Sequence, residues 1–176
     1  MDALILAAGD GTRLSPLTKN TPKVMIKVYG VPILERALHV LKKVGVKKVV
    51  IVIGYKGEVI QKYFGNKWNE MEIVYKKTDW YEDGILKSVI KAKDTLKKRF
   101  ILLCGDTIPN KNSLMRALET QGDMVISVRN VSDDTVVADV LGEGVVENVE
   151  MREDSKKFNR TVAGISVTES IFFEAV

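Results

Sequence analysis

The sequence predicts an α/β fold with a mostly parallel central sheet. Apolar runs rich in β-branched residues alternate with segments of helical periodicity through the first two-thirds of the chain, which is typical of strands joined by crossover helices. Residues 47–53 end in an unbroken run of valine and isoleucine, as expected for a strand that is covered on both faces. The 176 residues are enough for one hydrophobic core and show no repeat or linker, so we expect a single domain over residues 1–176.

The expected strands are short apolar segments bounded by turn residues. The first begins almost at the amino terminus and runs directly into a glycine-containing loop. Residues 100–104 form another uninterrupted apolar run, which ends at Gly105 and Asp106. In chain order, the predicted strands are residues 4–8, 47–53, 71–75, 100–104, 123–128, 136–140, 145–150 and 161–167.

The expected helices carry apolar residues at intervals of three and four. Pro32 stands where the first helix begins and Gly45 where it ends, which fits the preference of proline and glycine for those positions. Ser113 is expected to cap a later helix. The predicted helices are residues 34–44, 58–64, 85–97 and 113–118, and a further helix begins at residue 169.

The composition is that of a globular protein, with 45% hydrophobic and 28% charged residues. No apolar stretch approaches the ~18 residues that a membrane helix needs, and the amino terminus shows no leader, so we expect a cytoplasmic protein that does not enter a membrane. The net charge of +4 comes from scattered lysines, which argues against a nucleic-acid partner and suits an acidic small molecule. A single cysteine, Cys104, excludes an internal disulfide and a cysteine-built zinc site, and its apolar strand predicts a core position.

The loop after the first strand has the composition of a phosphate site. Gly9 and Gly11 permit a close approach of the backbone to a ligand. Arg13 can bind two phosphate oxygens at once, and Lys23 adds a compact positive charge. Because ligands of parallel sheets bind at the carboxyl ends of the strands, this loop is the predicted ligand site.

Two other kinds of glycine loop do not fit this stretch. The dinucleotide pattern G-x-G-x-x-G requires a glycine where Leu14 stands, and no acidic residue ends a second strand about twenty positions on, which disfavours a dinucleotide-dependent oxidoreductase. The G-x-x-x-x-G-K-[ST] loop is absent. Asp106, at the end of an apolar strand, is a candidate metal ligand, with a turn or helix cap as the alternative.

Residues 5–28 closely resemble the sugar-phosphate nucleotidylyltransferases, enzymes that join a nucleoside triphosphate to a sugar-1-phosphate and release pyrophosphate. The stretch Leu-Ala-Ala-Gly-x-Gly-Thr-Arg-Leu with the downstream Pro-Lys carries the resemblance, and residues 32–34, 105–106 and 163–165 extend it over nearly the whole chain. The resemblance implies a Rossmann-like three-layer sandwich of the nucleotide-diphospho-sugar transferase type. It also implies Mg²⁺ as the cofactor, and a nucleoside triphosphate and a sugar or polyol phosphate as partners.

The resemblance assigns a role to each matching residue of the nucleotide half. Ala7, Ala8 and Gly9 would lie against the base and ribose, Gly11, Thr12 and Arg13 would hold the β- and γ-phosphates, Lys23 would contact the α-phosphate, and Asp106 would bind Mg²⁺. Asp79 or Thr78 stands in the region that reads the base. Gly84 resembles the glycine that lets the following helix approach the base, although residues 83–86 are not the usual Gly-Thr-Ala.

The acceptor half departs further from the family pattern. Glu150 stands where the family has a Glu-Lys-Pro motif, but Met151 and Arg152 replace the lysine and the proline. Arg152 is then the candidate substitute for the acceptor-phosphate contact, and Gly164 belongs to the segment that resembles the sugar-contacting strand. These departures keep open a cytidylyltransferase that acts on a phospho-alcohol such as inositol phosphate or phosphocholine.

The resemblance also implies a second metal-binding aspartate, on a strand beyond the helix that begins at Glu169, and the sequence stops before it. We expect that this chain lacks the family's C-terminal segment, the alternatives being another metal ligand or Asp106 acting alone. A non-catalytic relative that binds nucleotide as a regulatory module therefore stays open. The base, the acceptor and a homo-oligomeric state are left undecided by the sequence.

Overall fold

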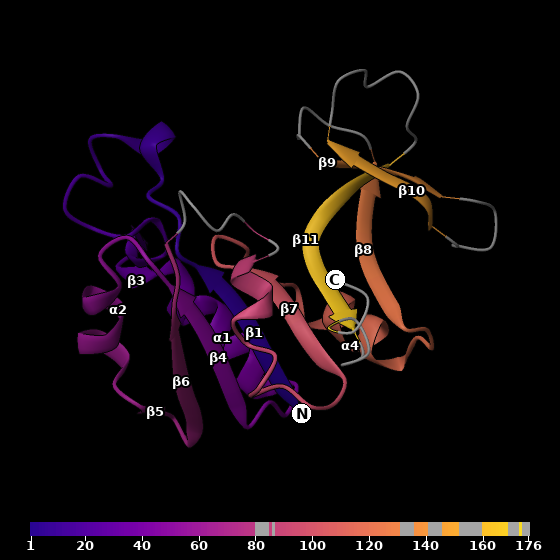
Figure 1. Cartoon of the computed structure of the whole chain (residues 1–176), viewed down its shortest axis with the longest axis horizontal. Helices are drawn as coiled ribbons and strands as arrows, with labels where there is room; N and C mark the ends of the chain where they lie inside the picture. Colours follow the sequence, from indigo (N-terminus) through magenta and orange to yellow (C-terminus); the bar gives the residue numbers. More distant parts are fainter. Residues whose placement is uncertain are drawn as a thin grey trace.

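Strand β1 (Asp2–Ala7) lies inside a large sheet, between β4 (Lys48–Ile53) and β7 (Phe100–Cys104), and runs parallel to both (Figure 1). The computed structural model describes residues 1–79, 85, 87–130, 136–140, 146–151, 160–168 and 173. Within these residues the sheet has nine strands in the order β10-β9-β11-β7-β1-β4-β6-β5, and β8 also pairs with β11. The remaining strands are β5 (Lys67–Trp68), β6 (Met71–Lys77), β8 (Met124–Asn130), β9 (Val136–Val140), β10 (Val146–Met151) and β11 (Arg160–Thr168).

The centre of the sheet is parallel and its flanks are antiparallel. Strands β7, β1, β4 and β6 run in one direction, whereas β11 pairs antiparallel with β7, β8 and β9. Three of these strands, β1, β4 and β7, are almost wholly apolar because both of their faces are covered, whereas β6 also carries exposed polar residues such as Glu72. This arrangement confirms the predicted α/β fold with a mostly parallel central sheet.

Helices or helical turns cover both faces of the sheet, which makes three layers. Alternate residues of β1 enter two separate cores: Ala3, Ile5 and Ala7 belong to one, and Leu4 to the other. The first core is closed by α1 (Ile33–Lys43), α2 (Gly57–Phe64) and α4 (Lys111–Glu119). The second is closed by Val89, Ala92 and Leu96, which lie in the segment predicted as the helix 85–97, and by Phe173.

Most strand predictions agree with the structure within one or two residues, and the helices differ more. In the segment 85–97, residues 85 and 87–90 are helical and residues 91–95 form turns. Of the helix predicted from residue 169, the structure describes Phe173 alone, whose ring stacks on Phe100 at 5.5 Å between centroids. The small hairpin of β2 (Lys27–Val28) and β3 (Val31–Pro32) was not predicted.

The cap of α4 is Asn110, which corrects the predicted cap at Ser113. The Asn110 side-chain oxygen accepts hydrogen bonds from the backbone N–H groups of Asn112 at 2.9 Å and Ser113 at 3.2 Å. Asparagine can therefore satisfy two of the unpaired N–H groups at the start of the helix. Ser113 lies inside the first turn and provides one of these donors.

Asn110→Ala is expected to lower the free energy of unfolding by about 1 kcal/mol, because both N–H groups lose their acceptor. Ser113→Ala is the matched control and is expected to change stability by less than about 0.5 kcal/mol, since alanine is the better helix former. Urea unfolding followed by circular dichroism measures both. An equal loss in the two variants would contradict the assignment of the cap.

In the part of the chain that the structure describes, no helix is long and apolar enough to cross a membrane.

Candidate active site

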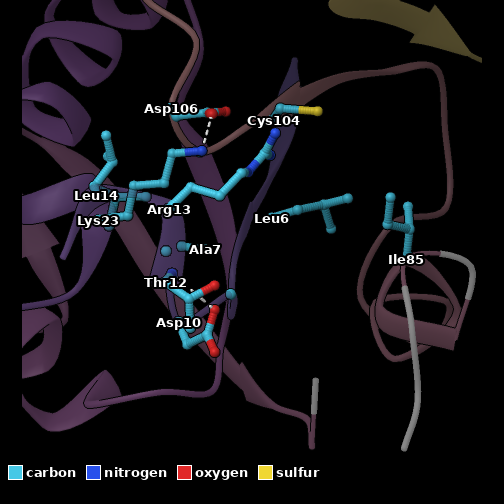
Figure 2. A pocket seen from close by; sticks show the side chains of 14 residues that line it. Leu6, Ala7, Asp10, Thr12, Arg13, Leu14, Lys23, Ile85, Cys104 and Asp106 are labelled. Atoms are coloured by element: carbon cyan, nitrogen blue, oxygen red, sulfur yellow. Dashed lines mark hydrogen bonds and ion pairs between the residues drawn. The ribbon is translucent and has the colours of Figure 1, made fainter. Parts of the chain in front are cut away.

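A cavity of about 500 Å³ lies at the carboxyl ends of β1 and β7 (Figure 2). Seven residues predicted for the nucleotide and metal sites line it together: Ala7, Gly9, Gly11, Thr12, Arg13, Lys23 and Asp106. They come from the end of β1, from the following loop of residues 9–20, which we call the phosphate loop, from the short helix η2 (Lys23–Met25) and from the turn after β7. Residues far apart in the sequence thus meet because β1 and β7 are neighbours.

Gly11 brings the phosphate loop against Lys23. Its φ of +66° lies in the left-handed region, and a Cβ atom added there would be 2.9 Å from the Lys23 Cβ and 3.0 Å from the Thr18 Cγ2. A side chain at this position would be strained and would collide with both neighbours. Gly11 is therefore required both by its conformation and by the close packing of the loop on Lys23.

Arg13 lies in the short helix η1 (Thr12–Leu14), which the Leu14 N–H closes by donating to the Gly11 carbonyl at 2.9 Å. The Asp10 carboxylate accepts from the Thr12 N–H at 3.2 Å. Asp10 also lines the cavity, and its position between the two loop glycines is the signal by which the sequence could have identified it. The loop thus presents one guanidinium and one carboxylate to the same space.

Lys23 and Asp106 form an ion pair in the cavity, as Figure 2 shows. Lys23 begins η2, and the next two residues, Val24 and Met25, are buried in the core. These apolar neighbours hold the backbone of Lys23 while its side chain reaches Asp106. The two side chains keep 29% and 40% of their exposure, so a ligand can reach both.

Gly105 fixes the position of Asp106. Its N–H donates to the Leu6 carbonyl at 2.8 Å, which continues the pairing of β7 with β1 beyond the strand. A Cβ atom at residue 105 would be 2.5 Å from the Leu6 oxygen and 2.7 Å from the Val24 Cγ1, so no other residue fits without a shift of the backbone. The backbone contacts of Gly105 consequently hold Asp106 next to the carboxyl end of β1.

Cys104 lines the cavity and is exposed, so its predicted core position is wrong. It is the last residue of β7, at the carboxyl end of the strand, where the chain leaves the core and reaches the cavity. Desolvation by the surrounding protein raises the pKa of the Cys104 thiol, the Asp106 carboxylate raises this pKa further, and Lys23 lowers it. The thiol is thus a less reactive group than an ordinary exposed cysteine.

The other predicted site residues lie elsewhere or outside the described residues. Ala8 is buried in the second core rather than in the lining, and Asp79 is exposed two residues beyond β6. Glu150 and Gly164 lie on β10 and β11, where the structure describes the backbone. Gly84 and Arg152 fall outside the described residues. The apolar residues Leu6, Leu14, Val24 and Ile85, which carry no chemical motif, complete the lining with Asp10, Cys104 and Gly105.

The carboxylates of Asp106 and Asp10 are the groups of the cavity that suit a divalent cation. Among the described residues, no cluster of three histidine, cysteine, aspartate or glutamate side chains could hold a metal by itself. Mg²⁺ commonly takes only one or two protein carboxylates and completes its shell with substrate phosphates and water. The donor set therefore fits a cation that binds together with a polyphosphate.

The sequence profile of the Nucleotidyl transferase family matches residues 2–136 of this chain. A UTP–glucose-1-phosphate uridylyltransferase of Haloferax volcanii is 35% identical over 137 residues, covering 76% of this chain and 56% of that protein. A bifunctional IPC transferase and DIPP synthase of Aquifex aeolicus is 39% identical over 124 residues, covering 70% of this chain and 28% of that protein. The chain thus matches little more than half of the first relative and less of the second.

The fold agrees with this relationship. The structure of an inositol-1-phosphate CTP transferase from T. maritima superposes with a TM-score of 0.80 at 24% identity, covering 98% of this chain and 72% of that one. The superposed part of this chain includes the mixed sheet with its parallel centre that is described above. The profile match over most of the chain and the shared fold show that this chain belongs to the nucleotidyl transferase family.

Proposed function

We propose that this chain binds a nucleoside triphosphate in the cavity and transfers its nucleotidyl group to a sugar-1-phosphate, with release of pyrophosphate. The observation that carries the proposal is the convergence of the Gly11 turn, Arg13, Lys23 and Asp106 on one cavity at the carboxyl ends of β1 and β7. Two cations and a left-handed glycine turn suit a chain of phosphates. The family membership and the uridylyltransferase relative support the same reaction class.

In this reaction an oxygen of the acceptor phosphate attacks the α-phosphorus of the triphosphate. A new P–O bond forms, the bond from the α-phosphorus to the bridging oxygen breaks, and pyrophosphate leaves with the bonding electrons. Negative charge increases on the α-phosphoryl oxygens and on the leaving group. We assign Lys23 to the α-phosphate and Arg13 to the β- and γ-phosphates, because preorganised cations stabilise the charge where it develops.

We infer that Mg²⁺ binds at Asp106 together with the phosphates. A bound divalent cation would supply additional stabilisation of the phosphoryl charge. Asp106 pairs with Lys23 in the structure, so the two groups can shift together when a polyphosphate and a cation provide new partners for both. In this proposal Lys23 moves from the carboxylate to a phosphate oxygen.

A phospho-alcohol acceptor is the second candidate, and one observation favours it. The Aquifex aeolicus relative, at 39% identity, is named as an IPC transferase. In either case we propose that the acceptor binds towards β10 and β11, near Glu150, Arg152 and Gly164. Base recognition is proposed for Asp79 and Gly84.

The decisive experiment measures pyrophosphate release for each common nucleoside triphosphate against a panel of sugar-1-phosphates, inositol phosphate and phosphocholine, with and without Mg²⁺. Metal-dependent release with a sugar-1-phosphate supports the first proposal, and release only with a phospho-alcohol supports the second. Nucleotide binding without release by any pair indicates a regulatory relative. Absence of nucleotide binding would refute all three.

Cys104 provides an independent measure of cavity occupancy, because it is the single cysteine of the chain. Its raised pKa means less thiolate at neutral pH, so alkylation by iodoacetamide is expected to be slow there and to keep increasing with pH above about 8.5, where the rate for an ordinary thiol levels off. Asp106→Asn is expected to accelerate alkylation at pH 8, since it removes a charge that raises the thiol pKa. Mass spectrometry of the intact protein gives each rate.

A nucleoside triphosphate with Mg²⁺ is expected to slow the alkylation of Cys104 by filling the cavity. The corresponding nucleoside is the matched control, because it lacks the phosphates that Arg13 and Lys23 are proposed to bind. Equal alkylation rates with and without every triphosphate would argue against binding in this cavity.

A further inference from the structure

The phosphate loop is fastened by two hydroxyl groups that do not line the cavity. The Thr18 hydroxyl donates to the Gly11 carbonyl at 2.9 Å, and Thr18 is almost fully buried. The Tyr55 hydroxyl lies 2.9 Å from the Lys19 carbonyl and 3.2 Å from the Thr18 carbonyl, so its one proton is shared between these acceptors. Tyr55 therefore contacts the end of the loop, and Thr18 connects that end to the glycine turn.

Tyr55 is itself held firmly, which allows it to act as an anchor. It stands two residues after β4, and its N–H donates to the Ala8 carbonyl at 3.0 Å. Gly54 makes this approach feasible, because a Cβ atom there would be 2.8 Å from the Ala8 oxygen and 3.1 Å from the Thr78 oxygen. The backbone of Tyr55 thus binds Ala8, the residue directly before the phosphate loop, while its hydroxyl binds the carbonyls of Thr18 and Lys19 near the end of the loop.

The next residue strengthens this contact. The Lys56 ammonium donates to the Asn20 side-chain oxygen at 3.2 Å and lies 5.6 Å from the centre of the Tyr55 ring. Residues 55 and 56 therefore bind the loop at residues 18–20, on the side away from Asp106. In the chain, the exposed Arg13 lies between the Gly11 turn, which packs on Lys23, and this anchor at residues 18–20.

We propose that Tyr55 is a positioning residue for triphosphate binding, which acts through Thr18 on the Gly11 turn and so orients Arg13 towards the phosphates. The inference rests on the proposed function and adds a residue that touches neither the cavity nor the substrate. A loop that is already ordered loses less conformational entropy when it binds its ligand. Tyr55 would thus strengthen nucleotide binding without a contact of its own.

The test compares Tyr55→Phe with Tyr75→Phe, a matched control. Tyr75 lies on β6, is half-buried, and donates its hydroxyl to the Gly65 carbonyl at 2.8 Å, so both variants remove one hydroxyl bonded to a backbone carbonyl. Neither tyrosine lines the cavity. Similar losses of thermal stability are expected, which separates the positioning role from a general effect on the fold.

Two measurements are made on the full chain. Hydrogen exchange without nucleotide is expected to be about fivefold faster in Tyr55→Phe at the loop amides of Leu14, Leu17 and Lys19, whose N–H groups are bonded within the loop, and unchanged in Tyr75→Phe. Calorimetric binding of the preferred triphosphate with Mg²⁺ is expected to weaken about fivefold in Tyr55→Phe alone. In turnover assays the KM for the triphosphate should rise, with little change in the KM for the acceptor.

Thr18→Val, which keeps the shape of the side chain and removes its hydroxyl, is expected to weaken triphosphate binding to a similar degree. The double variant should then lose less affinity than the sum of the two single changes, because both act on the same turn. If the two tyrosine variants had equal hydrogen-exchange rates at the loop amides and equal affinity for the triphosphate, and the parent protein bound the triphosphate, the positioning role alone would be overturned. A parent protein that binds no triphosphate would overturn the proposed function and the positioning role together.

Discussion

Lys23→Ala and Arg13→Ala are each expected to reduce pyrophosphate release by about a hundredfold or more, because removing one electrostatic contact to the developing charge costs about 3–4 kcal/mol of transition-state stabilisation. Both side chains line the cavity from segments that the core or the loop contacts hold in place. Water cannot replace them fully, since it must reorient as charge develops. The turnover number at saturating triphosphate and acceptor is the measurement.

The controls are Lys27→Ala and Arg116→Ala, which remove one exposed cation each from β2 and α4, outside the cavity lining. They test whether loss of positive charge alone weakens binding of an anionic substrate. The Lys23–Asp106 pair is partly exposed, so Lys23→Ala is expected to change stability little. Activity of Lys23→Ala or Arg13→Ala within about threefold of the parent, a difference of less than 1 kcal/mol, would refute the proposed roles.

The parallel strands were predictable because their sequences have one dominant requirement. Strands covered on both faces are apolar at nearly every position, as β1, β4 and β7 are, and β7 matches the predicted residues 100–104 at both ends. The phosphate loop was predictable for a similar reason. Gly11 must adopt a left-handed conformation under close packing, so the residue type itself reports the local geometry.

The contacts between distant segments could not be predicted in the same way. The pairing of Lys23 with Asp106 depends on β1 lying next to β7, which no local pattern specifies. Cys104 reads as a core residue because it ends an apolar strand, and its exposure follows from where that strand leaves the sheet. Asn110 and Ser113 are both good caps, and the path of the chain before α4 decides between them.

The anchoring role of Tyr55 illustrates the same limit. In the sequence, Tyr55 is one turn residue between a strand and a helix, and nothing near it suggests a phosphate site. It reaches the phosphate loop because β4 and β1 are parallel neighbours, so the segments that follow them leave the same edge of the sheet. Asp106 thus reaches the cavity from β7, on one side of β1, whereas Tyr55 follows β4, on the other side, and contacts the phosphate loop outside the cavity lining.

Asp106→Asn is expected to lower pyrophosphate release by about a hundredfold or more, because it removes the carboxylate proposed to hold Mg²⁺ on the phosphates. Asparagine keeps the size of the side chain, and Gly105 keeps the backbone in place through the Leu6 hydrogen bond, so the fold should be preserved. A second measurement does not depend on turnover. Calorimetry of triphosphate binding should show an increase in affinity with Mg²⁺ for the parent protein and a much smaller increase for Asp106→Asn.

Asp10→Asn is the informative comparison, because Asp10 is the other carboxylate of the cavity and asparagine can still accept the Thr12 N–H. If Asp106 holds the cation, Asp10→Asn should retain most of the Mg²⁺ dependence of binding. If Asp10→Asn lost the Mg²⁺ dependence of triphosphate binding and Asp106→Asn kept it, the cation would have to be assigned to Asp10 in the phosphate loop. Lys23 would then remain paired with Asp106 during the reaction, and its assignment to the α-phosphate would have to be abandoned as well.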